Sequence, residues 1–305
     1  MAESEQGRRS CPACESESSI DRGRKNAFQV LSCQKCGTVY TRELPGSPSA
    51  QDYDAYYTDA NLSVPEFIHR RLDEIVADFG QYRQGNRLLE IGFGAGTFLH
   101  AAQRAGWNAE GVEISKTAAE HGRAEGLKTF CGDLADAHYD DGSFDVVIAS
   151  EILEHVPNPQ VMIREVARIV RPGGLFWATT PNAEGVSARL LGIEWSIVSP
   201  PEHLHLFSED GLRGLLLSEG FGSCVVRTEG MNPIELLSKL RQRARAPRED
   251  NNGQRPGAEI DRVGKGYQLN EALLKSRSRR ALKNFVNGLL RLSHLGDSLK
   301  IRAER

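Results

Sequence analysis

Three glycines and two acidic residues occur in an order that suits a nucleotide-type ligand. Gly92, Gly94 and Gly96 follow an apolar run and open an amphipathic segment, and Glu90 lies just before them. A glycine turn between a strand and a helix lets a ligand approach the backbone, and the helix-start N–H groups favour anionic atoms. Glu113 follows at the end of the next apolar run, where a carboxylate can accept both hydroxyls of a ribose.

The spacing of this loop differs from the dinucleotide-binding fingerprint. In that fingerprint the third glycine lies three positions after the second, whereas here it lies two positions after it. A lone glycine loop would still suit an NAD-dependent enzyme of similar fold. Asp133, after a third short apolar run, could accept a hydrogen bond from an adenine amino group.

Two clusters of carboxylates and imidazoles could act on an acceptor. Glu151, Glu154 and His155 follow a buried-strand pattern and, in a helix, would share one face. They could hold a divalent ion such as Mg²⁺, or His155 could act as a base. Glu202 and His203 follow two prolines, and we take His203 as the first candidate for the general base. Packing or a cofactor contact is the alternative for His155, and His205 and Phe207 are expected to pack.

Four cysteines form two Cys-x-x-Cys pairs near the amino terminus: Cys11, Cys14, Cys33 and Cys36. Each pair can present two thiolates from one tight turn, and two such turns complete a tetrahedral structural zinc site, as in a zinc ribbon. The segment between them holds too little apolar sequence to fold without a metal. Two disulfides or a redox pair are the alternatives, and a cytosolic setting disfavours the first.

The candidate residues lie at the junctions of alternating apolar and amphipathic segments. This alternation is typical of an α/β protein with a doubly wound, mainly parallel sheet. It predicts strands over 87–91, 109–113, 128–131, 144–149, 175–180 and 224–228. It predicts helices that begin at 65 and over 97–105, 116–125, 160–170, 208–219, 233–243 and 269–295.

These ordered elements resemble the class I S-adenosylmethionine-dependent methyltransferases over residues 65–228. The resemblance rests on the glycine loop, the acid that ends the second strand, Gly132-Asp133-Leu134 and the segment 143–156. It implies a seven-stranded Rossmann-like sheet whose glycines hold the methionine part of the cofactor, with Glu113 on the ribose and Asp133 and Leu134 on the adenine. The implied cofactor contacts are Glu90, Gly92, Gly94, Gly96, Glu113, Ile114, Asp133, Leu134 and Ser150.

The block 151–156 resembles the ubiquinone-biosynthesis O-methyltransferases, whose corresponding acidic and histidine positions are tied to a divalent metal that aids catechol methylation. This resemblance implies O-methylation of a phenol, catechol or sugar hydroxyl on a small-molecule acceptor. Deoxysugar C-methyltransferases share a Glu-His pair at a place like 202–203 and a zinc-binding start, so C-methylation is the alternative. A nucleic-acid-modifying enzyme is disfavoured, because residues 1–238 are acidic and no base-flipping motif follows the fourth strand.

We expect four segments: a zinc ribbon over 1–44, a linker or lid over 45–64, a methyltransferase domain over 65–232 and a basic helical extension with a flexible linker over 233–305. Residues 239–305 hold 17 Lys and Arg and 7 Asp and Glu. We expect the basic amphipathic helix there to pack on the body or on a second subunit. The alternative is an anionic membrane surface, with a lipid-linked acceptor. A polar start and the lack of a long apolar run predict a cytoplasmic protein, peripheral at the inner membrane face in that alternative.

Overall fold

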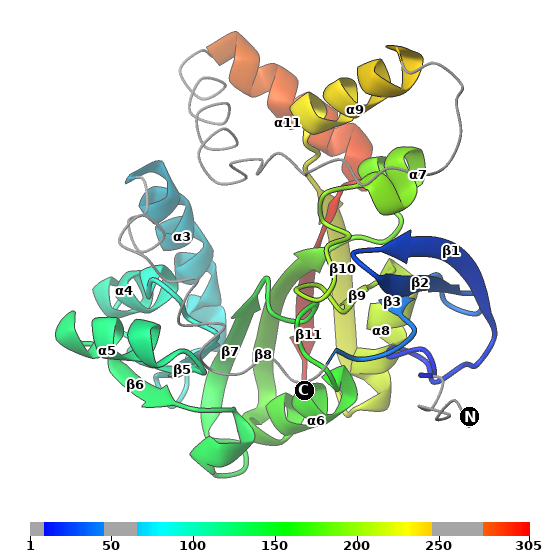
Figure 1. Ribbon diagram of the computed structural model, residues 1–305. Coiled ribbons are helices and arrows are strands. Elements are labelled where there is room, and N and C mark those ends of the chain that lie inside the picture. Colours follow the sequence, from blue (N-terminus) through cyan, green and yellow to red (C-terminus); the bar gives the residue numbers. More distant parts are fainter. Residues whose placement is uncertain (1–8, 46–65, 246–276) are drawn as a thin grey trace, which may run out of the picture.

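A seven-stranded sheet forms the centre of the computed structural model, which describes residues 9–45, 66–245 and 277–305. The strand order is β10-β11-β8-β7-β4-β5-β6, and the strands from β8 to β6 are parallel to their neighbours (Figure 1). The strands are β4 (Arg87–Ile91), β5 (Asn108–Glu113), β6 (Lys128–Cys131), β7 (Phe144–Ser150), β8 (Val170–Pro181), β10 (Ser223–Glu229) and β11 (Ser298–Glu304). The predicted doubly wound α/β class is confirmed.

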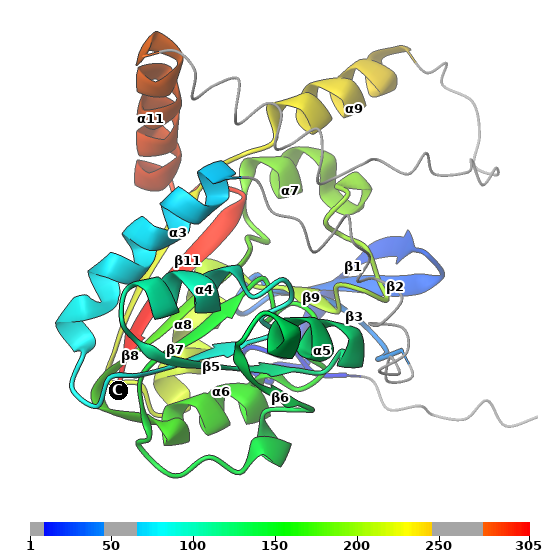
Figure 2. The same ribbon diagram turned by 90° about the vertical axis from the view of Figure 1, so that its left-hand side faces the viewer.

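Helices cover both faces of this sheet (Figure 2). The α-helices are α3 (Glu66–Asp78), α4 (Thr97–Arg104), α5 (Lys116–Ala124), α6 (Pro159–Ile169), α7 (Val186–Leu191), α8 (Glu209–Ser218), α9 (Pro233–Arg245) and α11 (Arg277–Leu292). Short 3₁₀ turns are η1 (Phe79–Tyr82), η2 (Ala135–Ala137) and η3 (Gly192–Glu194).

The two faces follow from the two-residue period of the strands. Leu88, Val146 and Ile148 pack with α3, α4 and α5, whereas Leu89 and Val147 pack with α6 and α8. All five side chains are fully buried, because a sheet covered on both faces exposes neither set. Because helices cover both faces of the sheet, a ligand can reach it only at the ends of its strands.

The last strand corrects the expected domain boundary at residue 232. β11 lies between β8 and β10 and is antiparallel to both, so residues 298–304 belong to the seven-stranded sheet. Leu299, Ile301 and Ala303 are buried, and the intervening Lys300 and Arg302 are partly buried. This alternation is the signal of a strand, which the basic composition of the segment obscured. The helices α9 and α11 therefore interrupt the sheet domain between its last two strands.

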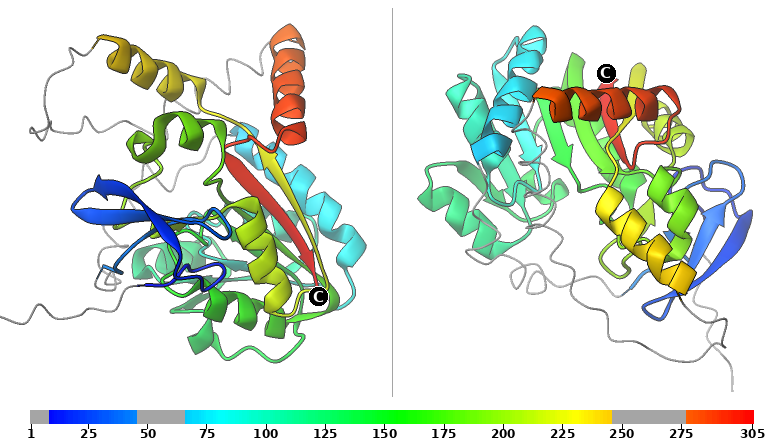
Figure 3. Two further views of the ribbon diagram at one scale, coloured as in Figure 1. Left: turned by 90° about the vertical axis from the view of Figure 1, so that its right-hand side faces the viewer. Right: turned by 90° about the horizontal axis from the view of Figure 1, so that it is seen from above.

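The amino-terminal segment forms a second sheet of order β1-β2-β3-β9. Its strands are β1 (Ser19–Lys25), β2 (Phe28–Cys33), β3 (Val39–Thr41) and β9 (His205–Leu206), all antiparallel to their neighbours. The last of these strands comes from the sequence that precedes α8. Figure 3 shows the amino-terminal strands in blue beside α8, so the segment 9–44 is docked onto the larger domain.

Helices α9 and α11 lie at the same end of the molecule as α7 (Figures 1 and 2). Leu236 of α9 packs with Leu191 and Trp195, and Leu290 of α11 is buried. The predicted linker or lid over 45–64, with its tyrosines Tyr53, Tyr56 and Tyr57, lies outside the described residues except for its first position. The predicted linker after α9 and the start of the predicted last helix lie outside them as well.

Candidate functional site

Four parallel strands bring the predicted cofactor residues to one edge of the sheet. Ile91 is in register with Val112 on one side and Ala149 on the other, and Glu113 pairs with Cys131. Parallel strands in such register end at the same edge, where ligands of open α/β sheets bind. The strand order reverses between β4 and β7, and the glycine loop and the segment after Ser150 flank that point.

The glycine loop makes a close approach that requires the absence of a side chain. Gly92 has a φ of +66°, a region that favours glycine, and a methyl group on it would lie 2.1 Å from Cδ1 of Ile152. Gly94 and Gly96 also have positive φ angles, of 50° and 68°. The loop therefore packs directly against the segment that follows β7.

Glu113 ties the glycine loop to the next helix. It is 3% exposed, and its Oε2 accepts a hydrogen bond from the Gly94 N–H at 3.1 Å. Its Oε1 accepts one from the Ser115 N–H at 2.9 Å. Each carboxylate oxygen has two lone-pair directions, so this geometry fits the predicted acceptance of ribose hydroxyls.

Glu90 is a buried carboxyl with an unpaired oxygen. Burial, together with the charge of Glu113, raises its pKa well above the usual range. Its Oε2 has no hydrogen-bond partner within the part of the chain that the structure describes. A buried polar atom without a partner is costly and rare, and it fits a site where a bound ligand supplies the donor. This unpaired oxygen and the glycine loop with its positive φ angles are the two features that fit S-adenosylmethionine.

The other predicted cofactor residues lie along the same edge. Ile114 follows β5 and is 40% exposed despite its large apolar side chain, as expected for a surface that a planar base covers. Leu134 is buried and Asp133 is exposed, directly after β6. The hydroxyl of Ser150 lies 3.1 Å from that of Thr179, at the end of β7. The structure thus brings all nine predicted contacts to four adjacent strand ends.

The segment after Ser150 is a turn and not the expected helix. Glu151 has a φ of +55°, and its backbone N–H donates to the Thr179 carbonyl at 2.9 Å, so the chain leaves β7 sharply. The expectation that Glu151, Glu154 and His155 share a helix face is therefore wrong. Their spacing also suits a tight turn, in which Glu151 is exposed and Glu154 is only 1% exposed. We call residues 151–157 the acceptor turn.

Glu154 faces two imidazoles. One carboxylate oxygen of Glu154 and one ring nitrogen each of His155 and His203 lie within 4.8 Å of one another. Oε2 of Glu154 accepts a hydrogen bond from the Thr180 hydroxyl at 2.8 Å, and its Oε1 lies 4.0 Å from Nε2 of His155. Burial and the charge of Glu151 raise the pKa of Glu154 well above its usual range.

Both imidazoles are oriented by backbone carbonyls. Nδ1 of His155 donates to the Glu202 carbonyl at 2.8 Å, and Nδ1 of His203 donates to the Ile197 carbonyl at 2.6 Å. Their ring centroids are 4.7 Å apart. In the neutral rings Nε2 then carries the lone pair, which can take a proton or bind a metal. The Glu202 side chain is exposed, and the residue acts on His155 through its carbonyl and through its charge, both of which favour the protonated ring.

Sequence reasoning missed two residues beneath this cluster. His205 is 2% exposed, and its Nε2 donates to the Leu153 carbonyl at 2.8 Å. Its Nδ1 lies 3.2 Å from an Nη2 donor of Arg9, which also donates to the Pro157 carbonyl at 2.9 Å. Burial lowers the pKa of His205 to about 3, so the ring is neutral near neutral pH. Arg9 lies almost 200 residues away in the sequence, and no local pattern points to it.

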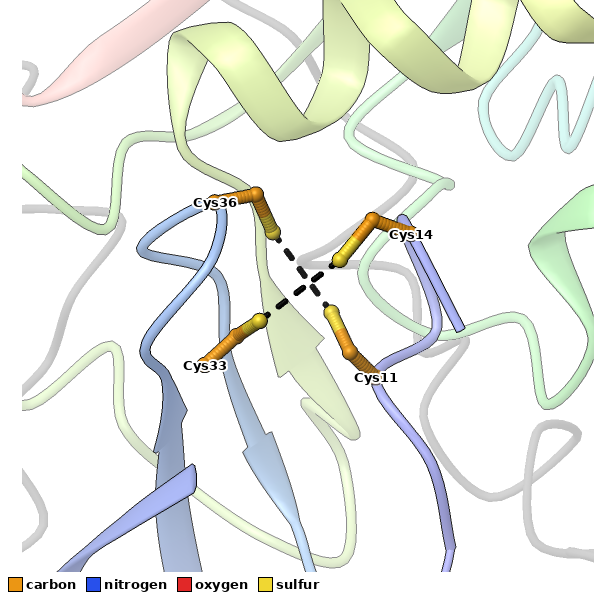
Figure 4. A group of neighbouring side chains, drawn as sticks. All are labelled: Cys11, Cys14, Cys33 and Cys36. Atoms are coloured by element: carbon orange, nitrogen blue, oxygen red, sulfur yellow. Dashed lines mark hydrogen bonds between the residues drawn. The ribbon is translucent and has the colours of Figure 1, made fainter. Parts of the chain in front are cut away.

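The four predicted cysteines converge on one point (Figure 4). The Sγ atoms of Cys11 and Cys36 lie 3.6 Å apart, as do those of Cys14 and Cys33, and no two of the four form a disulfide. Tetrahedral zinc with Zn–S bonds of about 2.3 Å places its sulfur ligands about 3.8 Å apart. The sulfur positions therefore fit one tetrahedral metal ion.

Curated relatives match the segment that carries these features. The chain is 32% identical over 161 residues to a ubiquinone biosynthesis O-methyltransferase of Ralstonia nicotianae, a match that covers 50% of this chain and 65% of that protein. It is 35% identical over 154 residues to 24-methylenesterol C-methyltransferase 2 of Oryza sativa subsp. japonica, covering 43% of this chain and 42% of that protein. The matched parts span less than two thirds of these relatives.

Solved structures share the fold at low sequence identity. A SAM-dependent methyltransferase from Archaeoglobus fulgidus has a TM-score of 0.53 at 16% identity, covering 83% of this chain and all of that one. A phosphoethanolamine N-methyltransferase of Haemonchus contortus, solved with S-adenosyl-L-methionine, has a TM-score of 0.54 at 21% identity, covering 88% of this chain and 62% of that one. The family model for a methyltransferase domain matches residues 64–223. The predicted class I methyltransferase is thus confirmed, and this chain belongs to the methyltransferase domain family.

Proposed function

We propose that this chain transfers the methyl group of S-adenosylmethionine to an oxygen of a small-molecule acceptor. The observation that carries the proposal is the direct packing of the glycine loop on the acceptor turn, where the Gly92 backbone contacts Ile152. This packing places the cofactor loop next to the turn that carries the Glu154 and His155 cluster. The similarity to ubiquinone biosynthesis O-methyltransferases favours a phenol or catechol hydroxyl, with a sugar hydroxyl as the second class.

The chemistry asked of the protein is alignment and proton removal. S-adenosylmethionine supplies an electrophilic methyl group on a sulfonium. The acceptor oxygen forms a bond to that carbon as the sulfur–carbon bond breaks, and the acceptor proton passes to a base. We take Nε2 of His203 as the first base and Nε2 of His155 as the second. Burial lowers the pKa of His155, which keeps its ring neutral and able to accept a proton near pH 7.

The same cluster bears on the predicted divalent ion. Mg²⁺ prefers oxygen ligands in octahedral geometry, whereas the clustered donors are two imidazoles and one carboxylate. Magnesium therefore does not fit this donor set, and a transition-metal ion does. Such an ion would be held by Glu154, His155 and His203, with Glu151 outside the set, and would lower the pKa of an acceptor hydroxyl.

The test combines cofactor binding with product analysis. Calorimetry with S-adenosylmethionine should show binding, and a screen of catechols, phenols and sugar nucleotides should yield a methoxy product by NMR. His203→Gln should lower kcat by about a hundredfold, the scale of general base catalysis, and leave cofactor affinity unchanged. His138→Gln, at an exposed histidine on another loop, is the matched control. A product methylated on carbon would instead support the C-methyltransferase alternative.

Metal dependence separates the two uses of the cluster. If a transition-metal ion is required, a chelator should abolish turnover and Mn²⁺, Fe²⁺ or Zn²⁺ should restore it, while Glu154→Gln should raise the metal concentration needed. Turnover that survives chelation with unchanged kcat would leave the histidines as bases alone. Glu151→Gln should change the metal requirement less than Glu154→Gln, because Glu151 is not one of the clustered donors and acts on the site only through the pKa of Glu154.

We also propose a membrane-surface contact for α11, which would suit a lipid-linked acceptor. Within the described residues, no helix is long and apolar enough to cross a bilayer. Phe285, Leu289 and Leu292 recur at helical spacing on α11 and are 63%, 51% and 81% exposed, so the expected packing of its apolar face is incomplete. The helix sequence holds five basic residues and no acidic one. Two such helices repel each other, whereas an anionic bilayer attracts them.

Vesicle binding tests this contact. The protein should sediment with vesicles that contain phosphatidylglycerol and not with phosphatidylcholine alone, and Leu292→Glu should weaken the binding. Leu217→Glu, at an exposed leucine on α8, is the control for a change in charge alone. Sedimentation velocity of the free protein tests the dimer alternative.

A further inference from the structure

The amino-terminal ribbon and the acceptor turn are joined through one short strand. β3 pairs with β9, with Tyr40 opposite His205. The Thr41 N–H donates to the Leu204 carbonyl at 3.0 Å, and the Leu204 N–H donates to the Glu154 carbonyl at 2.9 Å. The backbone of the ribbon is therefore continuous, by hydrogen bonds, with the backbone of the residue at the centre of the acceptor cluster.

Arg9 and His205 hold the two ends of the same turn. Arg9 donates to the carbonyl of Pro157, and His205 donates to the carbonyl of Leu153. Arg9 also donates to Nδ1 of His205, which leaves Nε2 of the neutral ring as the donor to Leu153. The bonds to Pro157 and Leu153 lie on either side of Glu154 and His155, and the third bond joins Arg9 to His205. A displacement of Arg9 would therefore release both flanks of the acceptor pair.

The cysteine cluster begins just after Arg9 along the chain. Arg9 is two residues before Cys11, and its Nη1 is buried without a hydrogen-bond partner among the described atoms. Arg9 also forms no ion pair with a carboxylate in the part of the chain that the structure describes. Four thiolates on one divalent ion carry a net charge of about −2, which would offset a buried guanidinium.

The cluster also contacts the segment that follows His205. The Ser208 hydroxyl donates to the Cys36 carbonyl, and a methyl group on Gly211 would lie 3.1 Å from the Cys36 Sγ and 2.5 Å from the Thr38 hydroxyl. The start of α8 is thus packed onto the second cysteine turn. The ribbon contacts the acceptor side through β9, through Arg9 and through α8.

We propose that the ribbon is a positioning element for the acceptor turn, in which Arg9 and His205 fix residues 153–157 and a metal ion on the four cysteines fixes Arg9. This inference rests on the proposed function, since it assigns a role to a turn that we place beside the methyl acceptor. Arg9 and His205 are positioning residues, because each acts through the backbone that carries Glu154 and His155.

The experiment uses the full chain with its metal bound and measures hydrogen exchange as well as turnover. Arg9→Gln should accelerate amide exchange in the peptide that spans 151–158. It should also lower kcat by about tenfold to a hundredfold, the scale of lost orientation, while the KM for S-adenosylmethionine and the zinc content stay unchanged. Arg9→Lys keeps one charged donor, so its exchange rate and kcat should lie between those of Arg9→Gln and the parent protein. Arg22→Gln, on the exposed part of β1, is the matched control and should change neither.

A second arm removes the metal and does not depend on turnover. Chelation of the cysteine site should accelerate exchange over 151–158 to the level of Arg9→Gln, and addition of Zn²⁺ should reverse it. Exchange unchanged in both arms would overturn the inference, even if methyl transfer is found. If no acceptor is found but exchange responds as expected, the proposed function fails while the link between ribbon and turn stands. Loss of cofactor binding in Arg9→Gln would also refute the inference, because it would indicate general unfolding.

Discussion

Replacement of Gly92 by alanine tests the contact on which the proposed function rests. An alanine at a φ of +66° costs about 1–2 kcal/mol in the left-handed region. The new methyl group would also lie 2.1 Å from Ile152 Cδ1 and 2.9 Å from its Cγ1, so Ile152 must move. Overpacking of this kind costs about 1–3 kcal/mol, which gives about 2–5 kcal/mol in the free energy of unfolding.

A matched glycine separates the two contributions. Gly126 has a φ of +82° but nothing within 4 Å of its missing Cβ, so Gly126→Ala carries the backbone strain alone, about 1–2 kcal/mol. Urea unfolding should therefore show a larger loss for Gly92→Ala. Calorimetry should show at least a tenfold loss of S-adenosylmethionine affinity, about 1.4 kcal/mol, for Gly92→Ala only.

A second substitution makes the reasoning falsifiable. Ile152→Ala removes the two atoms that clash, so the double variant Gly92→Ala/Ile152→Ala should lose less stability than the sum of the single variants. Equal stability losses in Gly92→Ala and Gly126→Ala, with unchanged cofactor affinity, would refute the idea that the glycine loop and acceptor turn share one tight interface.

Three further outcomes are expected. Glu113→Gln should weaken S-adenosylmethionine binding by about 1.5–3 kcal/mol in calorimetry, because it removes a charged acceptor of two backbone N–H groups. An affinity within twofold of that of the parent protein would contradict this prediction. The pKa of His205 is lowered from 6.5 to about 3, so between these values the unfolded chain binds a proton that the folded chain does not. The free energy of unfolding should therefore fall by up to about 1.4 kcal/mol per pH unit below pH 6.5. His205→Gln should flatten this slope in urea titrations, and an unchanged slope would contradict the prediction. Because burial lowers the pKa of His155, the acidic limb of the kcat profile should lie below pH 6.5, and a limb above that value would exclude His155 as the base.

The sequence predicted which residues gather at one edge of the sheet, because the signals for the strand ends are local. Each predicted contact, from Glu90 to Ser150, lies within five residues of a strand end, and alternating strands and helices dictate that such ends meet. The acceptor turn was harder. Spacings of three and four residues suit a helix or a tight turn equally well, and only the sharp exit from β7 at Glu151 decides between them.

The seventh strand shows a different limit. Its apolar and basic residues alternate, which is typical of a half-buried strand: Leu299, Ile301 and Ala303 alternate with Lys300 and Arg302. The segment nevertheless lies at the end of a basic stretch whose composition is typical of a helical tail. Its place between β8 and β10 is fixed by hydrogen bonds to both neighbours. Strand order is a property of the assembled sheet, so no local pattern states it.

The sequence by itself determined the kinds of chemistry available: a glycine loop with flanking acids, two imidazoles near carboxylates, and four thiolates at metal-binding spacing. Short spacings fix such sites, because a few bonds of chain limit where the side chains can go. Only the tertiary structure decided that His203 joins Glu154 and His155, that Arg9 bridges His205 and the acceptor turn, and that the ribbon completes its sheet with β9. Those pairs are 48 to 196 residues apart, a separation over which folding and not chain connectivity sets the distance.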